Sequence, residues 1–184
     1  MGKRATRWLL AGLVVLAGLG ADDRRSPGFD LPTSARVALA SHWGASQIRT
    51  VIRVIDGDTI VLDGNERVRL IGVDTPETVH PRKPVQFFGA EASAFTKRIA
   101  TGRSVRIEFD QANEHVDHKD RYGRTLAYVY LPDGELLNLE LVWRGYGHAY
   151  TKYPFRYADA FRAAERDARE HGRGLWADSS GASR

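Results

Sequence analysis

Short runs of Val, Ile and Leu, separated by Asp-Gly turns, dominate the chain from residue 49 onward. Three such runs follow one another closely, at 49–55, 59–63 and 67–73. Two more, at 103–110 and 124–131, flank a polar loop. β-Branched residues suit strands, and Asp-Gly between apolar runs is a strong hairpin signal. The pattern therefore predicts five short β-strands, the feature that most restricts the fold.

Three helices are expected among and after these strands. The segment 87–102 has apolar residues at helical spacing, and 157–172 repeats that pattern. A third helix is predicted at 137–145, with Asn138 as its candidate N-cap and Gly145 as its stop. Five strands with a helix after the third is the order expected of an OB-fold barrel. The predicted class is α+β, mainly a five-stranded OB-fold barrel with three helices.

Length and composition allow one domain with a substantial core. The chain has 184 residues, of which 42% are hydrophobic and 10% aromatic. It contains no cysteine, which excludes a disulfide framework and a thiolate metal site. Stability must therefore come from packing or from a bound ion.

The N-terminal segment has the features of a secretory signal peptide. Residues 1–21 join a basic start to an apolar run of 13 residues and then to small residues. A membrane-spanning helix needs about 20 apolar residues, so export to the periplasm or medium is expected, with a membrane anchor as the alternative. We expect a linker at 22–48, the folded domain at 49–177 and a tail at 178–184.

The positive charge of the chain comes mostly from this segment. The whole sequence has a formal net charge of +4 and a pI near 9.5. Lys3, Arg4 and Arg7 lie in the signal peptide, which has no acidic residue. Its removal leaves 24 basic against 23 acidic residues, a net charge of about +1. A nucleic-acid partner therefore cannot be inferred from net charge and must be argued from local residues.

Acidic side chains interrupt the first two predicted strands. Hairpin turns explain Asp56 and Asp63, since each precedes a glycine. They do not explain Asp58, which leads directly into the second strand. A second acidic element, Asp74 to Glu77, contains a proline that stiffens the turn. On its own that element could equally be a helix cap or a solvated turn.

Two arginines stand at positions that need an explanation. Arg69 lies inside the third predicted strand, and Arg124 begins the fifth, next to Tyr122. In the ordinary interpretation, the aliphatic part of the Arg69 side chain packs against its neighbours while its guanidinium reaches water. Arg124 would then be a charged residue at the edge of a strand. The functional interpretation is a pair of guanidinium groups that hold a phosphodiester, with the tyrosine as a stacking face.

Together these residues predict a site for phosphoryl chemistry. Asp58, Asp74 and the carbonyl of Thr75 are hard oxygen ligands that suit Ca²⁺ or Mg²⁺ and do not suit zinc. Glu77 is a further carboxylate able to position water, and the two arginines would neutralise developing charge. A weaker alternative is a transition-metal site at His115 and His118, which lie three residues apart in a polar loop.

Five motifs in one order resemble the thermonuclease family, the Ca²⁺-dependent nucleases typified by staphylococcal nuclease. They are VIDGDTIVL, RLIGVDTPET, HPRKPVQFFGAEASAFTK, DRYGRTLAY and LNLELVWRGYG, within about 50–177. The resemblance implies an OB-fold barrel with three helices. It also implies hydrolysis of DNA and RNA at the 5′-oxygen–phosphorus bond, which leaves 3′-phosphate ends.

The resemblance also implies a role for individual residues. Asp58 and Asp74 match the carboxylate ligands of Ca²⁺, Thr75 gives its main-chain oxygen, and Asp56 matches an acid near the ion. Glu77 takes the place of the proposed general base. The remaining matches are Arg69 and Arg124 for phosphate binding, Tyr122 for the nucleotide pocket, and the basic pair Arg82 and Lys83 for the nucleic-acid backbone.

The match is looser in two places. A second pocket tyrosine fits Tyr150 only if one residue is skipped. The loop at 110–120, which borders the cleft, is longer than the family's usual form, so it bears on substrate preference. We therefore expect a secreted, monomeric, calcium-dependent nuclease acting on DNA and RNA. The competing hypotheses are a non-catalytic OB-fold module that only binds nucleic acid and an envelope-anchored structural protein.

Overall fold

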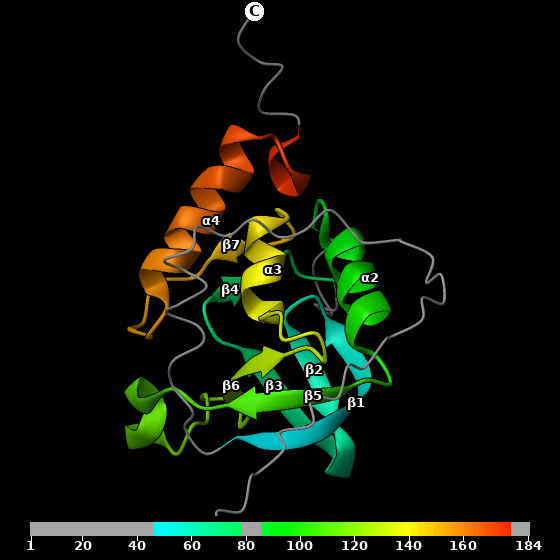
Figure 1. Cartoon of the computed structure of the whole chain (residues 1–184), viewed down its shortest axis with the longest axis vertical. Helices are drawn as coiled ribbons and strands as arrows, with labels where there is room; N and C mark the ends of the chain where they lie inside the picture. Colours follow the sequence, from blue (N-terminus) through cyan, green and yellow to red (C-terminus); the bar gives the residue numbers. More distant parts are fainter. Residues whose placement is uncertain (1–45, 79–85, 178–184) are drawn as a thin grey trace, which may run out of the picture.

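Five strands close into a barrel, which lies below the α-helices in the view of Figure 1. The structure, a computed structural model, describes residues 46–78 and 86–177. The strands follow the order β1-β2-β3-β6-β5, in which β3 and β6 are parallel and the other neighbouring pairs are antiparallel. They are β1 (Gln47–Asp56), β2 (Thr59–Leu62), β3 (Glu66–Leu70), β5 (Ser104–Glu108) and β6 (Thr125–Tyr130). The predicted fold class and barrel are confirmed.

Within 46–78 and 86–177, three α-helices pack on the barrel or on one another, as predicted. They are α2 (Gly89–Ala100), α3 (Leu137–Trp143) and α4 (Ala158–Glu170). α2 packs against β1, α3 against β6, and α4 against α3 (Figure 1). α2 begins two residues later than expected, because Phe88 adopts a left-handed conformation with φ of 65°. Short 3₁₀ helices are η1 (Asp63–Asn65), η2 (Gln111–Val116) and η3 (Gly174–Trp176).

The third predicted strand is broken in two. β3 ends at Leu70, and the separate strand β4 (Val73–Asp74) pairs with β7 (His148–Ala149). Gly72 makes this break, with φ of +80° and no room for a side chain: a Cβ there would lie 2.7 Å from the Phe155 ring. The turn carries Asp74 out of the barrel wall to the edge of the candidate site.

Asn138 does not cap α3, contrary to the prediction. It lies inside the helix and is fully buried. Its side chain accepts a hydrogen bond from Val129 N and donates to the carbonyl oxygens of Ile71 and Ala127. These three groups belong to β6 and to the turn after β3, where the carbonyl oxygen of Ala127 also accepts from Ile71 N. Asn138 therefore fixes α3 to the same turn that positions Asp74.

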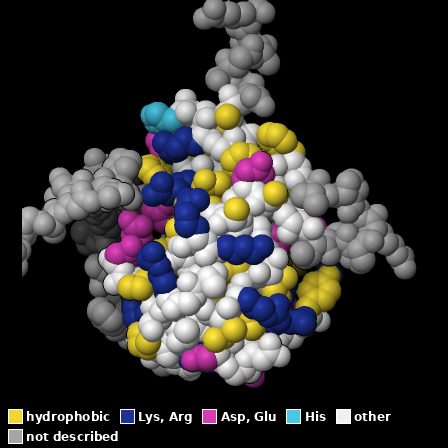
Figure 2. Space-filling view, turned by 90° about the vertical axis from the view of Figure 1, so that its right-hand side faces the viewer, with side chains coloured by type: hydrophobic (Ala, Val, Ile, Leu, Met, Phe, Trp, Pro, Cys, Tyr) yellow, Lys and Arg dark blue, Asp and Glu magenta, His cyan; other side chains and the backbone are white. Residues whose placement is uncertain are grey.

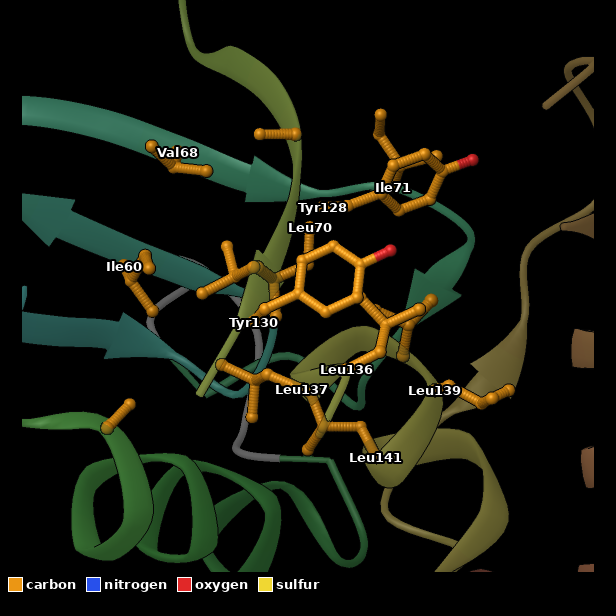
Figure 3. Close-up of a cluster of buried hydrophobic side chains, with 14 of the residues drawn as sticks. Ile60, Val68, Leu70, Ile71, Tyr128, Tyr130, Leu136, Leu137, Leu139 and Leu141 are labelled. Carbon is orange, nitrogen blue, oxygen red and sulfur yellow. The ribbon is translucent and has the colours of Figure 1, made fainter. Parts of the chain in front are cut away.

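The core fills the space between the barrel and α3. Figure 3 shows Leu137 and Leu141 from α3 lying against Leu70 and Tyr130, with Ile60 and Val68 further along the strands. Tyr128 is fully buried, and its hydroxyl donates to Asp110. Burial and that carboxylate raise the pKa of Tyr128 above its ordinary value, so it remains a neutral donor.

The pairing register brings three polar residues into one row on the barrel wall. Asp56 on β1 is opposite Thr59 on β2, and Thr59 is opposite Arg69 on β3. Directly paired residues share a face of the sheet, so these side chains form one continuous surface.

Some predictions concern parts of the chain that the structure does not describe. The signal peptide, the linker up to residue 45 and the tail at 178–184 lie outside the described residues, and β1 begins at Gln47. Within 46–78 and 86–177, no helix has the length and apolar character needed to cross a membrane.

Candidate active site

Asp58 is the centre of a hydrogen-bonded group at the end of β1 and β2. Its side chain is buried, with a relative exposure of 6% for the residue. Oδ2 accepts from the backbone N of Thr75 at 2.9 Å and from the Thr75 hydroxyl at 3.1 Å. Oδ1 accepts from the Thr59 hydroxyl at 3.0 Å. These donors hold the carboxylate in one orientation.

The close approach of the two acidic segments depends on Gly57. A Cβ at this position would lie 2.7 Å from the Thr75 hydroxyl oxygen, closer than real Cβ contacts allow. The carbonyl of Gly57 also accepts a 2.7 Å hydrogen bond from the buried Thr96 of α2. The glycine between the two aspartates therefore lets the Asp58 turn pack against Thr75 and fixes both to α2.

Arg69 joins the two predicted metal-ligand carboxylates. Its Nη1 lies 3.1 Å from Oδ2 of Asp58 and donates to the Val73 carbonyl at 2.6 Å. Its Nη2 donates to Oδ1 of Asp74 at 2.8 Å. Only 13% of the Arg69 side chain is exposed. The head is therefore held in the site, and the interpretation of Arg69 as a packed stem with a solvated head is wrong.

Asp74 lies at the rim of the site, with 54% of its side chain exposed. Partial burial of its carboxyl group raises the pKa of Asp74, and the carboxylates of Asp58 and Asp56 add to the increase. Arg69 and His148, which is paired with Asp74 across β4 and β7, lower the pKa of Asp74. Three acidic groups therefore repel one another here, and added positive charge would relieve that repulsion.

Asp56 and Glu77 form a neighbouring acidic pair. Asp56 is buried and accepts from Gly57 N and from the backbone and hydroxyl of Thr78. Burial raises the pKa of Asp56, and a side-chain hydrogen bond with Glu77 raises it further. The backbone of Glu77 is paired with Gln86 in both directions. The structure therefore places Glu77 beside Asp56, within two residues of the Thr75 turn.

Arg124 reaches the site from β6, through Thr59. Its Nη1 donates to the Thr59 hydroxyl at 3.3 Å, and the same hydroxyl donates to Asp58. Asp120 holds the other side of the guanidinium through Nε at 2.7 Å and also accepts from Arg124 N. These contacts lower the pKa of Asp120 despite its partial burial. Thr59 therefore links Arg124 to Asp58, the carboxylate that Arg69 contacts directly.

The predicted nucleotide contacts are more dispersed. Tyr122 is 66% exposed, and the guanidinium of Arg124 lies 5.4 Å from its ring centroid. Tyr150 is 37% exposed, with its ring 6.1 Å from that of Tyr153. Tyr122 lies beside the phosphate-binding candidates, while Tyr150 is attached by its backbone to Gly72. Lys83, with Arg82, lies outside the described residues.

Sequence reasoning missed two residues that organise the site. The Thr59 hydroxyl accepts a hydrogen bond from Arg124 and donates one to Asp58, and the Asp120 carboxylate accepts from Nε of Arg124. The available signals were the position of Thr59 directly after Asp58 and the turn that Asp120 begins four residues before Arg124. The contact of Thr59 with Arg124 was not visible in the sequence, because the two residues are 65 positions apart.

The alternative metal site in the 110–120 loop is not formed. The His118 ring stacks on Phe109 with centroids 4.7 Å apart. Across 46–78 and 86–177 there is no cluster of three or more acidic, histidine or cysteine side chains suited to hold a metal. The calcium site predicted above is of a different kind, because it needs two carboxylates and one main-chain oxygen.

Comparison with known proteins identifies the family. The profile described as "Staphylococcal nuclease homologue" matches residues 67–178. The chain is 45% identical over 136 residues to a protein named "Thermonuclease" from Staphylococcus hyicus, covering 72% of this chain and 77% of that protein. It is 47% identical over 130 residues to a "Thermonuclease" from Staphylococcus intermedius, covering 68% and 74%. The chain belongs to the staphylococcal nuclease family.

A third relative extends the same conclusion. "Endonuclease YncB" from Bacillus subtilis (strain 168) is 38% identical over 135 residues, which cover 71% of this nuclease and 62% of the relative. The resemblance predicted from the five motifs is confirmed, and the chain is a phosphodiester hydrolase whose substrate is nucleic acid. These relatives favour an enzyme over the two non-catalytic hypotheses.

Proposed function

We propose that this nuclease depends on calcium, cleaves both DNA and RNA by in-line attack of water and leaves 3′-phosphate ends. The observation that carries the proposal is the bridge that Arg69 makes between Asp58 and Asp74. It brings two carboxylates and a guanidinium into contact at the edge of the barrel. Phosphoryl transfer uses both kinds of group, because carboxylates hold a cation and guanidinium groups neutralise the phosphate.

The carboxylates of Asp58 and Asp74 and the main-chain oxygen of Thr75 would hold the ion. Carboxylate and carbonyl oxygens are the ligands that Ca²⁺ prefers, and the chain has no cysteine to favour a softer metal. The raised pKa of Asp74, caused by partial burial and the nearby acids, fits a site that gains from added positive charge. A bound divalent ion supplies Lewis-acid polarisation of a phosphoryl oxygen.

Arg69 and Arg124 would bind the phosphate oxygens on which charge develops. Each is held by carboxylates and partly buried, so little rotamer freedom remains to be lost when a phosphate binds. A single arginine aimed at the transition state contributes roughly 10³–10⁵ to the rate of some phosphoryl transfers. The planar fork suits the paired oxygens of a phosphodiester better than an ammonium group does.

Glu77 would orient the attacking water or accept its proton. General bases of this kind contribute roughly 10²–10⁴ to the rate. Asp56 and the Gln86 contacts restrain Glu77 at the edge of the acidic group. Tyr122 and Tyr150 would stack on bases or sugars at either side, and Lys83 would contact the backbone.

We propose that the enzyme is exported to the periplasm or the medium and acts as a monomer. The signal peptide predicted at 1–21 supports export, with retention by an uncleaved membrane anchor as the alternative.

A digest of defined oligonucleotides tests the proposal. The purified protein is incubated with DNA and with RNA in Ca²⁺, then with EGTA, and the product ends are identified by mass. We expect cleavage of both polymers in Ca²⁺, 3′-phosphate ends, and loss of cleavage in EGTA. Cleavage that persists in the chelator, or products ending in 3′-hydroxyl groups, would contradict the proposal.

A further inference from the structure

The face of the sheet that carries Arg69 also carries two arginines outside the site. Arg67 precedes Arg69 by two positions on β3, so their side chains leave the same face. Arg67 is paired with Val61 of β2, and Val61 is paired in turn with Arg53 of β1. Arg53 and Arg67 are both exposed. One row of the barrel wall therefore contains two outward arginines.

This row continues to the active site. β3 and β6 are parallel, with Val68 beside Thr125. The preceding position on each strand places Arg67 next to Arg124. The order across the sheet is therefore Arg53, Val61, Arg67 and Arg124, over a path of roughly 14 Å at about 4.8 Å between strands. The catalytic row, with Thr59 and Arg69, lies one side-chain repeat away on the same face.

The two outer arginines are available for a ligand. In the described part of the chain, no carboxylate pairs with Arg53 or Arg67, whereas the nearby Arg49 is bound by Asp63 and Glu66. The position between them is Val61, which adds no charge. Figure 2 shows the side of the domain that carries α2 and β1, with Lys and Arg side chains spread over it, a group of Asp and Glu at its left edge and further acidic side chains elsewhere.

We propose that Arg53 and Arg67 bind the backbone of an extended polynucleotide that leaves the active site across β3, β2 and β1. The proposal rests on the proposed nuclease site, since Arg124 supplies the phosphate contact from which the path begins. Two exposed guanidinium groups in line with a catalytic arginine match a polyanion with regularly spaced charges. Such contacts add affinity for long substrates without taking part in the reaction.

The test compares substrates of two lengths. A dinucleotide reaches only the cleaved phosphate, whereas a 12-nucleotide single strand can also reach the outer arginines. In the double variant Arg53→Gln/Arg67→Gln, we expect KM for the longer substrate to rise roughly tenfold at low salt with kcat unchanged. The slope of log KM against log salt concentration should fall by about 1.4, or about 0.7 for each lost phosphate contact. Dinucleotide cleavage should be unchanged.

A matched control removes the same charge elsewhere. Arg166→Gln/Arg169→Gln changes two exposed arginines of α4, which packs on α3 and β7 away from this face (Figure 1). This variant should cleave both substrates like the parent protein. An equal rise in KM for the 12-nucleotide strand in the two double variants would overturn the proposal. An equal rise in KM for the dinucleotide and the 12-nucleotide strand in Arg53→Gln/Arg67→Gln would also overturn it. Dinucleotide cleavage by the parent protein tests the nuclease site separately, so failure there is distinguishable from failure of the path.

Discussion

Arg69 donates a 2.8 Å hydrogen bond to Asp74, five residues further along the chain. The turn at Gly72 makes this contact possible, because it moves Asp74 from the continuation of β3 to a separate strand. The same guanidinium lies against Asp58. One side chain therefore holds together the two acidic motifs that are separate in the sequence.

Replacing Arg69 by lysine should reduce kcat by roughly 10²–10³. An ammonium group cannot contact the Val73 carbonyl, Asp58 and Asp74 in the geometry that the fork provides. Steady-state kinetics on a dinucleotide checks this. The control is Arg67→Lys on the same strand, which should leave dinucleotide turnover unchanged. Equal activity of Arg69→Lys and the parent protein would contradict a role for the fork.

Thr59→Val should lower kcat/KM by roughly tenfold or more with little change in fold. The valine keeps the β-branched shape but removes the hydroxyl that accepts from Arg124 and donates to Asp58. Thr59→Ser, which restores the hydroxyl, should recover most of the activity. If the serine and valine variants have the same kcat/KM, the Thr59 hydroxyl has no catalytic importance.

The secondary structure and the charged residues of the site could be predicted from the sequence, whereas the contacts of Thr59 and Asn138 could not. The strands and helices follow from local periodicity, and the acids and arginines stand out as charged residues next to apolar strands. The role of Thr59 was not predictable, because it depends on Arg124, which is 65 residues away in sequence. Asn138 is similar: its partners on β6 and the Ile71 turn are set by packing, so a local capping rule gave the wrong role.

Glu140→Gln should stabilise the protein increasingly as pH rises. Burial raises the pKa of Glu140, although Arg144 donates to it and opposes the change. Between its ordinary value of about 4.3 and the raised native value, the folded protein keeps a proton that the unfolded chain has lost, so this group makes stability fall as pH rises. Urea unfolding at about pH 4 and about pH 7 measures the effect. A variant-minus-parent difference that does not depend on pH would contradict it.

Calcium with a nucleotide should raise the melting temperature, and Asp74→Asn should abolish that rise. At a ligand concentration 100 times Kd, linkage predicts about 2.7 kcal/mol of added stability. Without calcium, the Asn variant should melt at or above the parent temperature, because the raised pKa of Asp74 reflects partial burial and acidic neighbours that disfavour its charge. Asp159→Asn on α4, a fully exposed acid, is the charge control and should retain the calcium response.

A crystal structure of the protein with Ca²⁺ and a nucleoside bisphosphate tests the central claim most directly. The account predicts a calcium anomalous signal in contact with Asp58, Asp74 and the Thr75 carbonyl, with Arg69 and Arg124 on the phosphate. A calcium ion bound elsewhere, or a phosphate that neither arginine contacts, would contradict it.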